Sequence, residues 1–365
     1  MRKPGRQTND VSEKFQWQMP AILVAGILLG AVASRALAPV PPPPPPVLPQ
    51  DGLRLVRATA VGLSHPIVAC ANNTTLSTHL AKLQSDVQAV LDAARPQGLT
   101  RAGAYVVDLE SCQSFSIGPD ERFHPASMLK VPIAMAWLRR LGTDPNGLQQ
   151  LFQYDVVAPI DAHEDANAPE ALHPGASYTV EVLLKHMLID SRNDSKWLLG
   201  KHLPPEQFDA VWRDLGLPAP DMKRDVLLRA RDVGALLEAL YDGTAMGQKA
   251  SDQALTWLAA ATWRDGLMAL LPADAVVAHK YGRRGLSATG VSSDIAQRDA
   301  TGKLIEVPAQ PGQPAIQLSD CGILYRPGHP MLACVMTEGL NEAVVTHVLQ
   351  KVGKLVWDWQ AGDTR

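Results

Sequence analysis

A run of six consecutive prolines, Pro41–Pro46, divides this chain into two parts that cannot share one core. Proline lacks a backbone N–H and has a fixed φ, so the run forms neither helix nor sheet ladder and extends as polyproline II. Eight of the 29 prolines fall between Pro39 and Pro49, in a chain of 365 residues. We therefore predict a proline-rich linker over 41–68, and one large globular domain over 69–360.

The segment before the linker has the pattern of a membrane anchor. Residues 1–18 carry four lysines and arginines against two acidic residues, which predicts a cytoplasmic amino end. Residues 19–40 are apolar apart from Arg35, which can reach the interface. A cleaved signal peptide is the alternative, because Ala31-Val32-Ala33 has the small-x-small form of a cleavage site. The prediction is a bacterial envelope protein: anchored in the inner membrane with its domain in the periplasm, or secreted if the signal is cleaved.

The composition excludes several classes of protein. Hydrophobic residues make up 46% and charged residues 19%, so the bulk is neither a disordered tail nor a polytopic membrane protein. A net charge of -3 gives no general attraction for nucleic acid, and we predict none as a partner. His163-Glu164-Asp165 lies in a long loop over 158–177 without a second histidine at ligand spacing. We predict no metal site and no cofactor.

The four cysteines are consistent with export. They include no C-x-x-C pair, which disfavours zinc. Cys321 and Cys334 flank a turn at Pro327-Gly328, so in a hairpin their thiols would face each other. Cys70 precedes a helical stretch and Cys112 ends the strand after it, which would bring these two together. We predict disulfides Cys70–Cys112 and Cys321–Cys334; the alternative is four buried free thiols.

The apolar periodicity predicts strands at both ends of the domain and helices between them. Helices are expected at Thr75–Ala94, Thr179–Met187, Lys196–Leu203, Asp232–Tyr241 and Asn341–Trp359. Strands are expected at Ala102–Leu109, Ser114–Ile117, Val276–Lys280, Gly322–Tyr325 and Leu332–Met336. This order predicts an α+β fold: an antiparallel sheet formed from both ends of the domain, flanking helices in three α/β/α layers, and an all-helical lobe inserted between the strands.

The first chemical motif is Ser127-Met-Leu-Lys130, at the start of an expected helix. Residues i and i+3 share a helix face, so the hydroxyl and the amine can lie within hydrogen-bond reach. A serine is a poor nucleophile until a base takes its proton, and a desolvated lysine can be that base. Helix-start N–H groups would also stabilise an oxyanion. Alone, the motif is weak, because S-x-x-K also occurs by chance at solvated helix ends.

Two further motifs follow in the chain. Ser191-Arg192-Asn193 lies in the helical lobe, where a hydroxyl and an amide could relay protons and hold a substrate amide. An ordinary helix cap is the simpler interpretation of that segment. Lys280-Tyr281-Gly282 ends an expected strand, where a lysine could bind a carboxylate and a glycine would let a ligand approach the strand edge. Most such lysines lie in surface turns.

The order of the three motifs is more specific than any one of them. S-x-x-K, then S-x-N in a helical lobe, then K-x-G on a later strand is the active-site set of serine β-lactamases and penicillin-binding proteins. The chain resembles the class A β-lactamase-like serine hydrolases from about Leu76 to Trp357. Val106–Ser111 and Tyr178–Leu184 also carry the resemblance. It implies a β-lactamase/transpeptidase-like fold.

The resemblance also implies catalytic roles. Ser127 would be the acyl-accepting nucleophile, and Lys130 its base or proton relay. Ser191 would pass a proton to the leaving nitrogen. Asn193 would hold the substrate amide and Lys130. The implied chemistry is an acyl-serine intermediate formed with a β-lactam or a peptidoglycan-type D-alanyl peptide.

Substrate binding would fall to the third motif. Lys280 would bind the substrate carboxylate, with Tyr281 and Gly282 beside it. The backbone N–H groups of Ser127 and Arg283 would form the oxyanion hole. Tyr281 stands where the family has a small hydroxyl residue, so its bulk would narrow the groove.

The sequence departs from the family at the deacylation step. Class A enzymes carry E-x-x-x-N between the second and third motifs, and its glutamate activates the hydrolytic water. Glu206 and Glu238 fall in expected helices, without asparagine at that spacing. The expected stretch, 215–225, has only Asp221 and Asp225 as carboxylates, both interpreted as solvated loop residues. We therefore expect acylation with slow hydrolysis of the acyl-serine.

Other departures lie around the third motif. Arg283 or Arg284 could compensate for the bulk of Tyr281. Arg192 replaces the usual acid of the second motif. About thirty extra residues over 286–318 form an expected loop beside the site. Three functions stay open: a β-lactam-accepting serine hydrolase, a D-alanyl peptidase or transpeptidase, and a non-catalytic envelope binding domain.

Overall fold

The computed structural model places most of the domain. The residues it describes are 56–57, 62–64, 67–69, 78–142, 144, 146–155, 172–222, 226–285, 316–326 and 329–362. The expected cytoplasmic end, the anchor or signal, and most of the linker lie outside these ranges. So do the loop at His163-Glu164-Asp165 and nearly all of the expected 286–318 loop.

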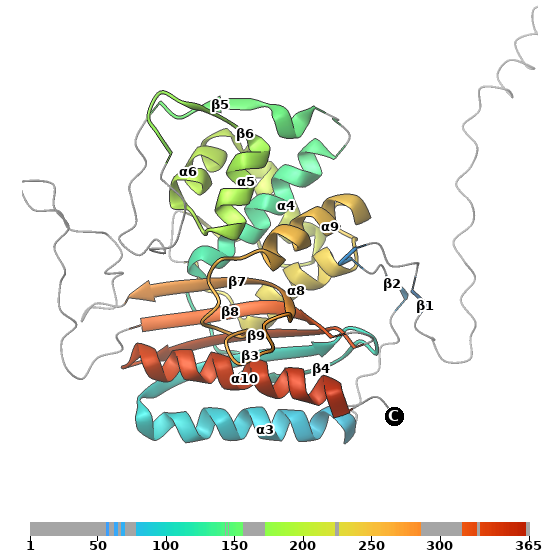
Figure 1. Ribbon diagram of the computed structural model, residues 1–365, viewed down its shortest axis with the longest axis vertical. Coiled ribbons are helices and arrows are strands. Elements are labelled where there is room, and N and C mark those ends of the chain that lie inside the picture. Colours follow the sequence, from blue (N-terminus) through green and yellow to red (C-terminus); the bar gives the residue numbers. More distant parts are fainter. Residues whose placement is uncertain are drawn as a thin grey trace, which may run out of the picture. The chain divides into compact units, whose positions relative to one another are not determined.

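A five-stranded antiparallel sheet forms the centre of the domain (Figure 1). The strands are β3 (Leu99–Asp108), β4 (Gln113–Ile117), β7 (Val276–Gly285), β8 (Ile316–Tyr325) and β9 (Met331–Gly339). Their order is β4-β3-β9-β8-β7, so strands from both ends of the domain meet between β3 and β9. The predicted origin of the sheet is confirmed. All residues of β9 are buried, because both faces of the sheet are covered.

Two helices cover one face of the sheet. They are α3 (Thr78–Ala94) and α10 (Glu342–Gly362), close to the boundaries expected from their apolar spacing. Both run along the sheet beneath its strands in Figure 1. Their apolar stripes, which include Val87, Leu91, Val348 and Val352, join one buried cluster with the sheet.

The helical lobe covers the other face and confirms the three-layer prediction (Figure 1). It consists of α4 (Lys130–Leu141), α5 (Val180–Ile189), α6 (Asn193–His202), α7 (Pro205–Asp214), α8 (Ala230–Tyr241) and α9 (Gln248–Ala259). A short antiparallel pair, β5 (Leu151–Gln153) and β6 (Ser177–Thr179), lies beside α5. The described residues also form three 3₁₀ turns: η1 (Arg95–Gln97), η2 (Ala126–Leu129) and η3 (Gly147–Gln149).

One predicted disulfide is present between described residues. Cys321 and Cys334 lie directly opposite each other in the β8–β9 pairing and are bridged, with Cα atoms 3.9 Å apart. Cys112 is disulfide-bonded as well, but it lies in the β3–β4 turn with φ +58° rather than at a strand end. Its expected partner, Cys70, lies outside the described residues.

Residues before 69, the expected start of the domain, already contact the domain. β1 (Val56–Arg57) and β2 (Ile67–Ala69) form a short antiparallel pair. Between them, the carbonyl oxygen of Leu63 accepts a hydrogen bond from the Tyr325 hydroxyl at 2.9 Å, and its N–H donates to Asp252. Within the ranges that the structure describes, no helix combines the length and the apolarity that crossing a membrane requires.

Candidate active site

Ser127 and Lys130 meet at the junction of η2 and α4. Ser127 lies in the 3₁₀ turn, and Lys130 is the first residue of the α-helix. Residues i and i+3 eclipse in a 3₁₀ turn, so the two side chains lie one above the other. Lys130 Nζ donates to Ser127 Oγ at 3.0 Å, and Lys130 is fully buried. The spacing had indicated that these two side chains could lie within hydrogen-bond reach.

Ser191 joins the pair from the turn between α5 and α6. Its φ is +58°, an uncommon conformation for a residue with a side chain, and it directs the residue toward both lysines. Lys130 Nζ donates to the Ser191 carbonyl oxygen and, at 3.2 Å, to its Oγ. Lys280 Nζ donates to the same Oγ at 2.9 Å. Because both lysine nitrogens lie within hydrogen-bond distance of that oxygen as donors, its own O–H is left to donate.

Lys280 lies on β7, the edge strand nearest the lobe. It is 2% exposed, and its ammonium also lies 4.3 Å from the centre of the Tyr281 ring. The Tyr281 ring stacks on Trp263 with centroids 4.2 Å apart. The lysine of the third motif thus lies between the Ser191 hydroxyl and the face of the Tyr281 ring.

Gly282 lets β7 approach the Ser127 turn closely. A Cβ at this position would lie 2.4 Å from the Pro125 carbonyl oxygen and 3.3 Å from Ala126 Cβ. Arg283 follows on the same strand, and its guanidinium makes two hydrogen bonds to Glu342, at 2.8 and 2.9 Å. This ion pair directs the Arg283 side chain to the start of α10.

The second-motif turn contains a buried ion pair. Arg192 Nη2 lies 2.7 Å from Asp194 Oδ2, and both side chains are buried. Asp194 also accepts the N–H of Leu172 at 3.0 Å. Burial opposes its ionisation, but the hydrogen bonds from Arg192 and Leu172 outweigh burial and lower the pKa of Asp194. Asn193 is the first residue of α6, between these two charged residues and two positions after Ser191.

The carboxylates considered as bases for deacylation differ in burial and in their partners. Glu206 is exposed in the first turn of α7, and Asp221 is exposed in the loop after it. Burial raises the pKa of Glu238, which is on α8 and hydrogen-bonded to Tyr105. Asp225 lies outside the described residues. None of these described carboxylates has a direct contact with Ser127.

Residue-level reasoning missed several groups near the site. His124 Nδ1 accepts the Ala126 N–H at 3.0 Å, and the His124 N–H donates to Gln317 at 3.0 Å. His279 and Asp320 form a buried pair at 2.9 Å, next to Lys280 on β7. The His-Pro dipeptide before the nucleophile was a local signal for the first contact. The others join residues far apart in the chain and left no sequence signal.

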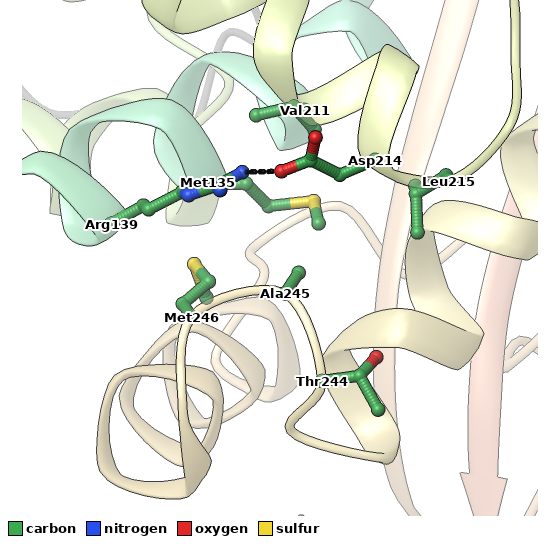
Figure 2. Close-up of a pocket in the computed structure, with 8 residues that line it drawn as sticks. All are labelled: Met135, Arg139, Val211, Asp214, Leu215, Thr244, Ala245 and Met246. Carbon is green, nitrogen blue, oxygen red and sulfur yellow. Dashed lines mark ion pairs between the residues drawn. The ribbon is translucent and has the colours of Figure 1, made fainter.

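A small pocket in the lobe is separate from this cluster. Figure 2 shows its lining residues, among them Met135 and Met246, with the Arg139–Asp214 ion pair across it. Its volume is about 120 Å³, and none of the three motifs contributes to the lining. Over the described residues, no group of three or more His, Cys, Asp or Glu side chains could hold a metal ion.

The fold and the serine–lysine cluster define an active-site-serine hydrolase of the acyl-enzyme type. The profile of the Beta-lactamase enzyme family matches residues 82–360, which is most of the domain. The chain belongs to that family. The resemblance inferred from the three motifs is therefore confirmed.

Solved structures share the fold at low identity. A β-lactamase from Sphaerobacter thermophilus is 19% identical with a TM-score of 0.59, over 77% of this chain and 98% of that one. A β-lactamase from Chitinophaga pinensis is 19% identical with a TM-score of 0.60, over 76% and 98%. A variant of PBP-A, in an acyl-enzyme complex with penicillin G, is 21% identical with a TM-score of 0.58, over 78% and 98%. The predicted fold is confirmed.

Proposed function

We propose that this protein is an exported, membrane-tethered serine hydrolase that forms an acyl-serine with β-lactams or D-alanyl peptides and releases it slowly. One observation carries the proposal: Lys130 Nζ donates to the hydroxyls of both Ser127 and Ser191. This contact connects a nucleophile, a buried amine and a second hydroxyl by hydrogen bonds. Such a chain of groups can move a proton from the attacking serine to a leaving nitrogen.

We assign one group to each step of acylation. The first step requires Lys130 as the neutral amine, and its burial is the setting in which a lysine amine serves as a base. Ser127 Oγ attacks the carbonyl carbon while its proton passes to Lys130 Nζ, and Lys130 then returns a proton to Ser191 Oγ as the carbon–nitrogen bond breaks. The Ser191 O–H, left to donate, protonates the departing nitrogen. Lys280 supplies positive charge for the substrate carboxylate. The backbone N–H groups of Ser127 and Arg283 are the proposed donors to the oxyanion.

Slow release follows from the carboxylates described above. Hydrolysis of the acyl-serine needs a base that activates water. Glu206 and Asp221 are exposed, and Glu238 is hydrogen-bonded to Tyr105. We propose that none of the three activates that water. We propose a long-lived acyl-enzyme, the behaviour of a penicillin-binding protein rather than of an efficient β-lactamase. The acyl-enzyme complex of the PBP-A variant supports penicillin as the probe.

Labelling with a fluorescent penicillin tests this function. The full chain in mild detergent should take up one covalent label, and Ser127→Ala should take up none. Ser177→Ala is the matched control, because Ser177 is exposed at the start of β6. A chromogenic cephalosporin should be turned over far more slowly than about 1 per second, the lower end of typical enzyme rates.

Each result has a distinct meaning. Rapid turnover of the cephalosporin would contradict slow release and point to an unrecognised base. Release of D-alanine from a D-alanyl-D-alanine peptide would favour the peptidase over a role limited to β-lactams. No label with the wild-type chain would contradict the enzymatic proposal and favour a non-catalytic envelope binding domain.

The exported location rests on the amino-terminal pattern and on the cysteines. Residues 1–40 have the charge and hydropathy of a signal-anchor, and the Cys321–Cys334 bridge is typical of an oxidising compartment. Protease added to spheroplasts should remove the domain and leave it intact in cells with a sealed outer membrane. Protection of the domain in spheroplasts would contradict export.

A further inference from the structure

The turn that presents Ser127 is strained just before the nucleophile. Ala126 has φ +48°, a left-handed conformation that a residue with a Cβ rarely adopts. Pro125, before it, has no N–H to hold the turn. The 3₁₀ turn begins at Ala126. A backbone hydrogen bond runs from the Met128 N–H to the Pro125 carbonyl oxygen at 3.0 Å. The Ala126 N–H therefore needs an acceptor from elsewhere.

The side chain of His124 supplies that acceptor. Its Nδ1 lies 3.0 Å from the Ala126 nitrogen and accepts the N–H, so Nδ1 carries no proton in this arrangement. A side-chain atom that accepts the N–H two residues further on reproduces the turn made by asparagine and aspartate. Nδ1 of histidine and Oδ1 of asparagine occupy equivalent positions, one bond beyond Cγ. The imidazole closes the turn as an Asx side chain would.

His124 is itself anchored to the sheet. Its N–H donates to Gln317 Oε1 at 3.0 Å, and Gln317 Nε2 donates to Glu338 at 2.7 Å. Glu338 pairs with Arg101 at 3.1 Å. Gln317, Glu338 and Arg101 lie on β8, β9 and β3, which are neighbouring strands of the sheet. These strands therefore anchor His124, and His124 in turn fixes the turn before Ser127.

We propose that His124 is a positioning residue for acylation, which fixes the Ala126–Ser127 turn by accepting the Ala126 N–H. It touches neither the substrate nor the reacting atoms and acts through Ala126. The inference rests on the proposed role of Ser127 as the nucleophile. The proposal attributes the positioning of the turn to the Nδ1 acceptor of His124 and not to the size of the imidazole ring.

Two substitutions test the hydrogen-bond acceptor and the aromatic ring of His124 independently. His124→Phe keeps an aromatic ring and removes the acceptor, while His124→Asn removes the ring and keeps an acceptor in the equivalent place. His173→Phe is the matched control, because His173 is exposed before β6. In the full chain, single-turnover labelling with fluorescent penicillin separates the acylation rate constant from the affinity of the preceding complex.

The expected pattern is specific to the acceptor. Loss of one hydrogen bond at the nucleophile's turn should slow acylation in His124→Phe by about tenfold, with the initial affinity unchanged. The acylation rate constant of His124→Asn should stay within about threefold of the wild-type value, and that of His173→Phe should equal the wild-type value. Equal losses in the phenylalanine and asparagine variants would overturn the proposal, and so would a wild-type rate in His124→Phe.

A second measurement does not depend on acylation. Hydrogen exchange of the Ala126 amide, followed by NMR, should be slow in wild type and in His124→Asn and at least about tenfold faster in His124→Phe. If wild type takes up no penicillin, the proposed function fails while the exchange result still decides the role of His124. Equal exchange in all three proteins would overturn the positioning role.

Discussion

Gly282 is the position where the smallest change should most disturb the site. In Gly282→Ala the new methyl group would lie 2.4 Å from the Pro125 carbonyl oxygen and 3.3 Å from Ala126 Cβ. The first is a backbone atom, which no side-chain rotation can move away. An ordinary contact between carbon and oxygen is about 3.3 Å, so β7 and the nucleophile turn must separate by about 1 Å.

Two measurable effects follow from that separation. Overpacking of this kind lowers the free energy of unfolding by about 1–3 kcal/mol. A misplacement of about 1 Å between catalytic groups lowers a reaction rate by about 100-fold. We therefore expect Gly282→Ala to acylate with fluorescent penicillin about 100-fold more slowly than wild type, and to unfold at a lower urea concentration.

The control is a glycine with free space around it. A Cβ at Gly200, on α6, has no atom within 4 Å, so Gly200→Ala should raise stability by about 1 kcal/mol through helix propensity and leave acylation unchanged. Wild-type acylation by Gly282→Ala would refute the argument, because β7 and the turn would then not be in the contact described.

Three further predictions concern stability. Serine at both Cys321 and Cys334 should lower the free energy of unfolding by about 3 kcal/mol, since the bridge spans a sequence separation of 13; an unchanged urea midpoint would count against it. Glu342→Gln breaks an exposed ion pair and should cost less than about 1 kcal/mol in urea, with acylation unaffected. Burial raises the pKa of Glu238. The folded state therefore holds that proton more tightly than the unfolded state, and stability falls as pH rises above the ordinary glutamate value. Glu238→Gln should melt higher than wild type near pH 8 and like wild type near pH 4; a pH-independent difference would contradict this.

Local patterns predicted the parts of the site that depend on local geometry. Ser127 and Lys130 are three residues apart, so helical geometry alone brings them together. Cys321 and Cys334 are joined by one hairpin, whose register follows from its turn. The strand and helix periods also placed the sheet and its outer helices.

Contacts between distant segments could not be predicted in this way. Ser191 and Lys280 are 89 positions apart, and His124 and Gln317 are 193 apart, so only the folded sheet and lobe bring them together. The order of the motifs indicated the first contact through resemblance to a family. The contact between His124 and Gln317 had no comparable signal, because a histidine before a proline is compatible with many loops.

The buried pair in the second motif explains how the chain tolerates its departure from the family there. Arg192 stands where the family has an acid, but Asp194 returns a carboxylate to the same turn two residues later. That carboxylate accepts the Leu172 N–H, so it fastens the Ser191 turn to a neighbouring segment. Arg192 neutralises the buried charge, and removal of either partner would leave the other uncompensated, at about 3–5 kcal/mol. Arg192 is thus a buried structural cation, and its ion pair with Asp194 is part of what holds the Ser191 turn in place.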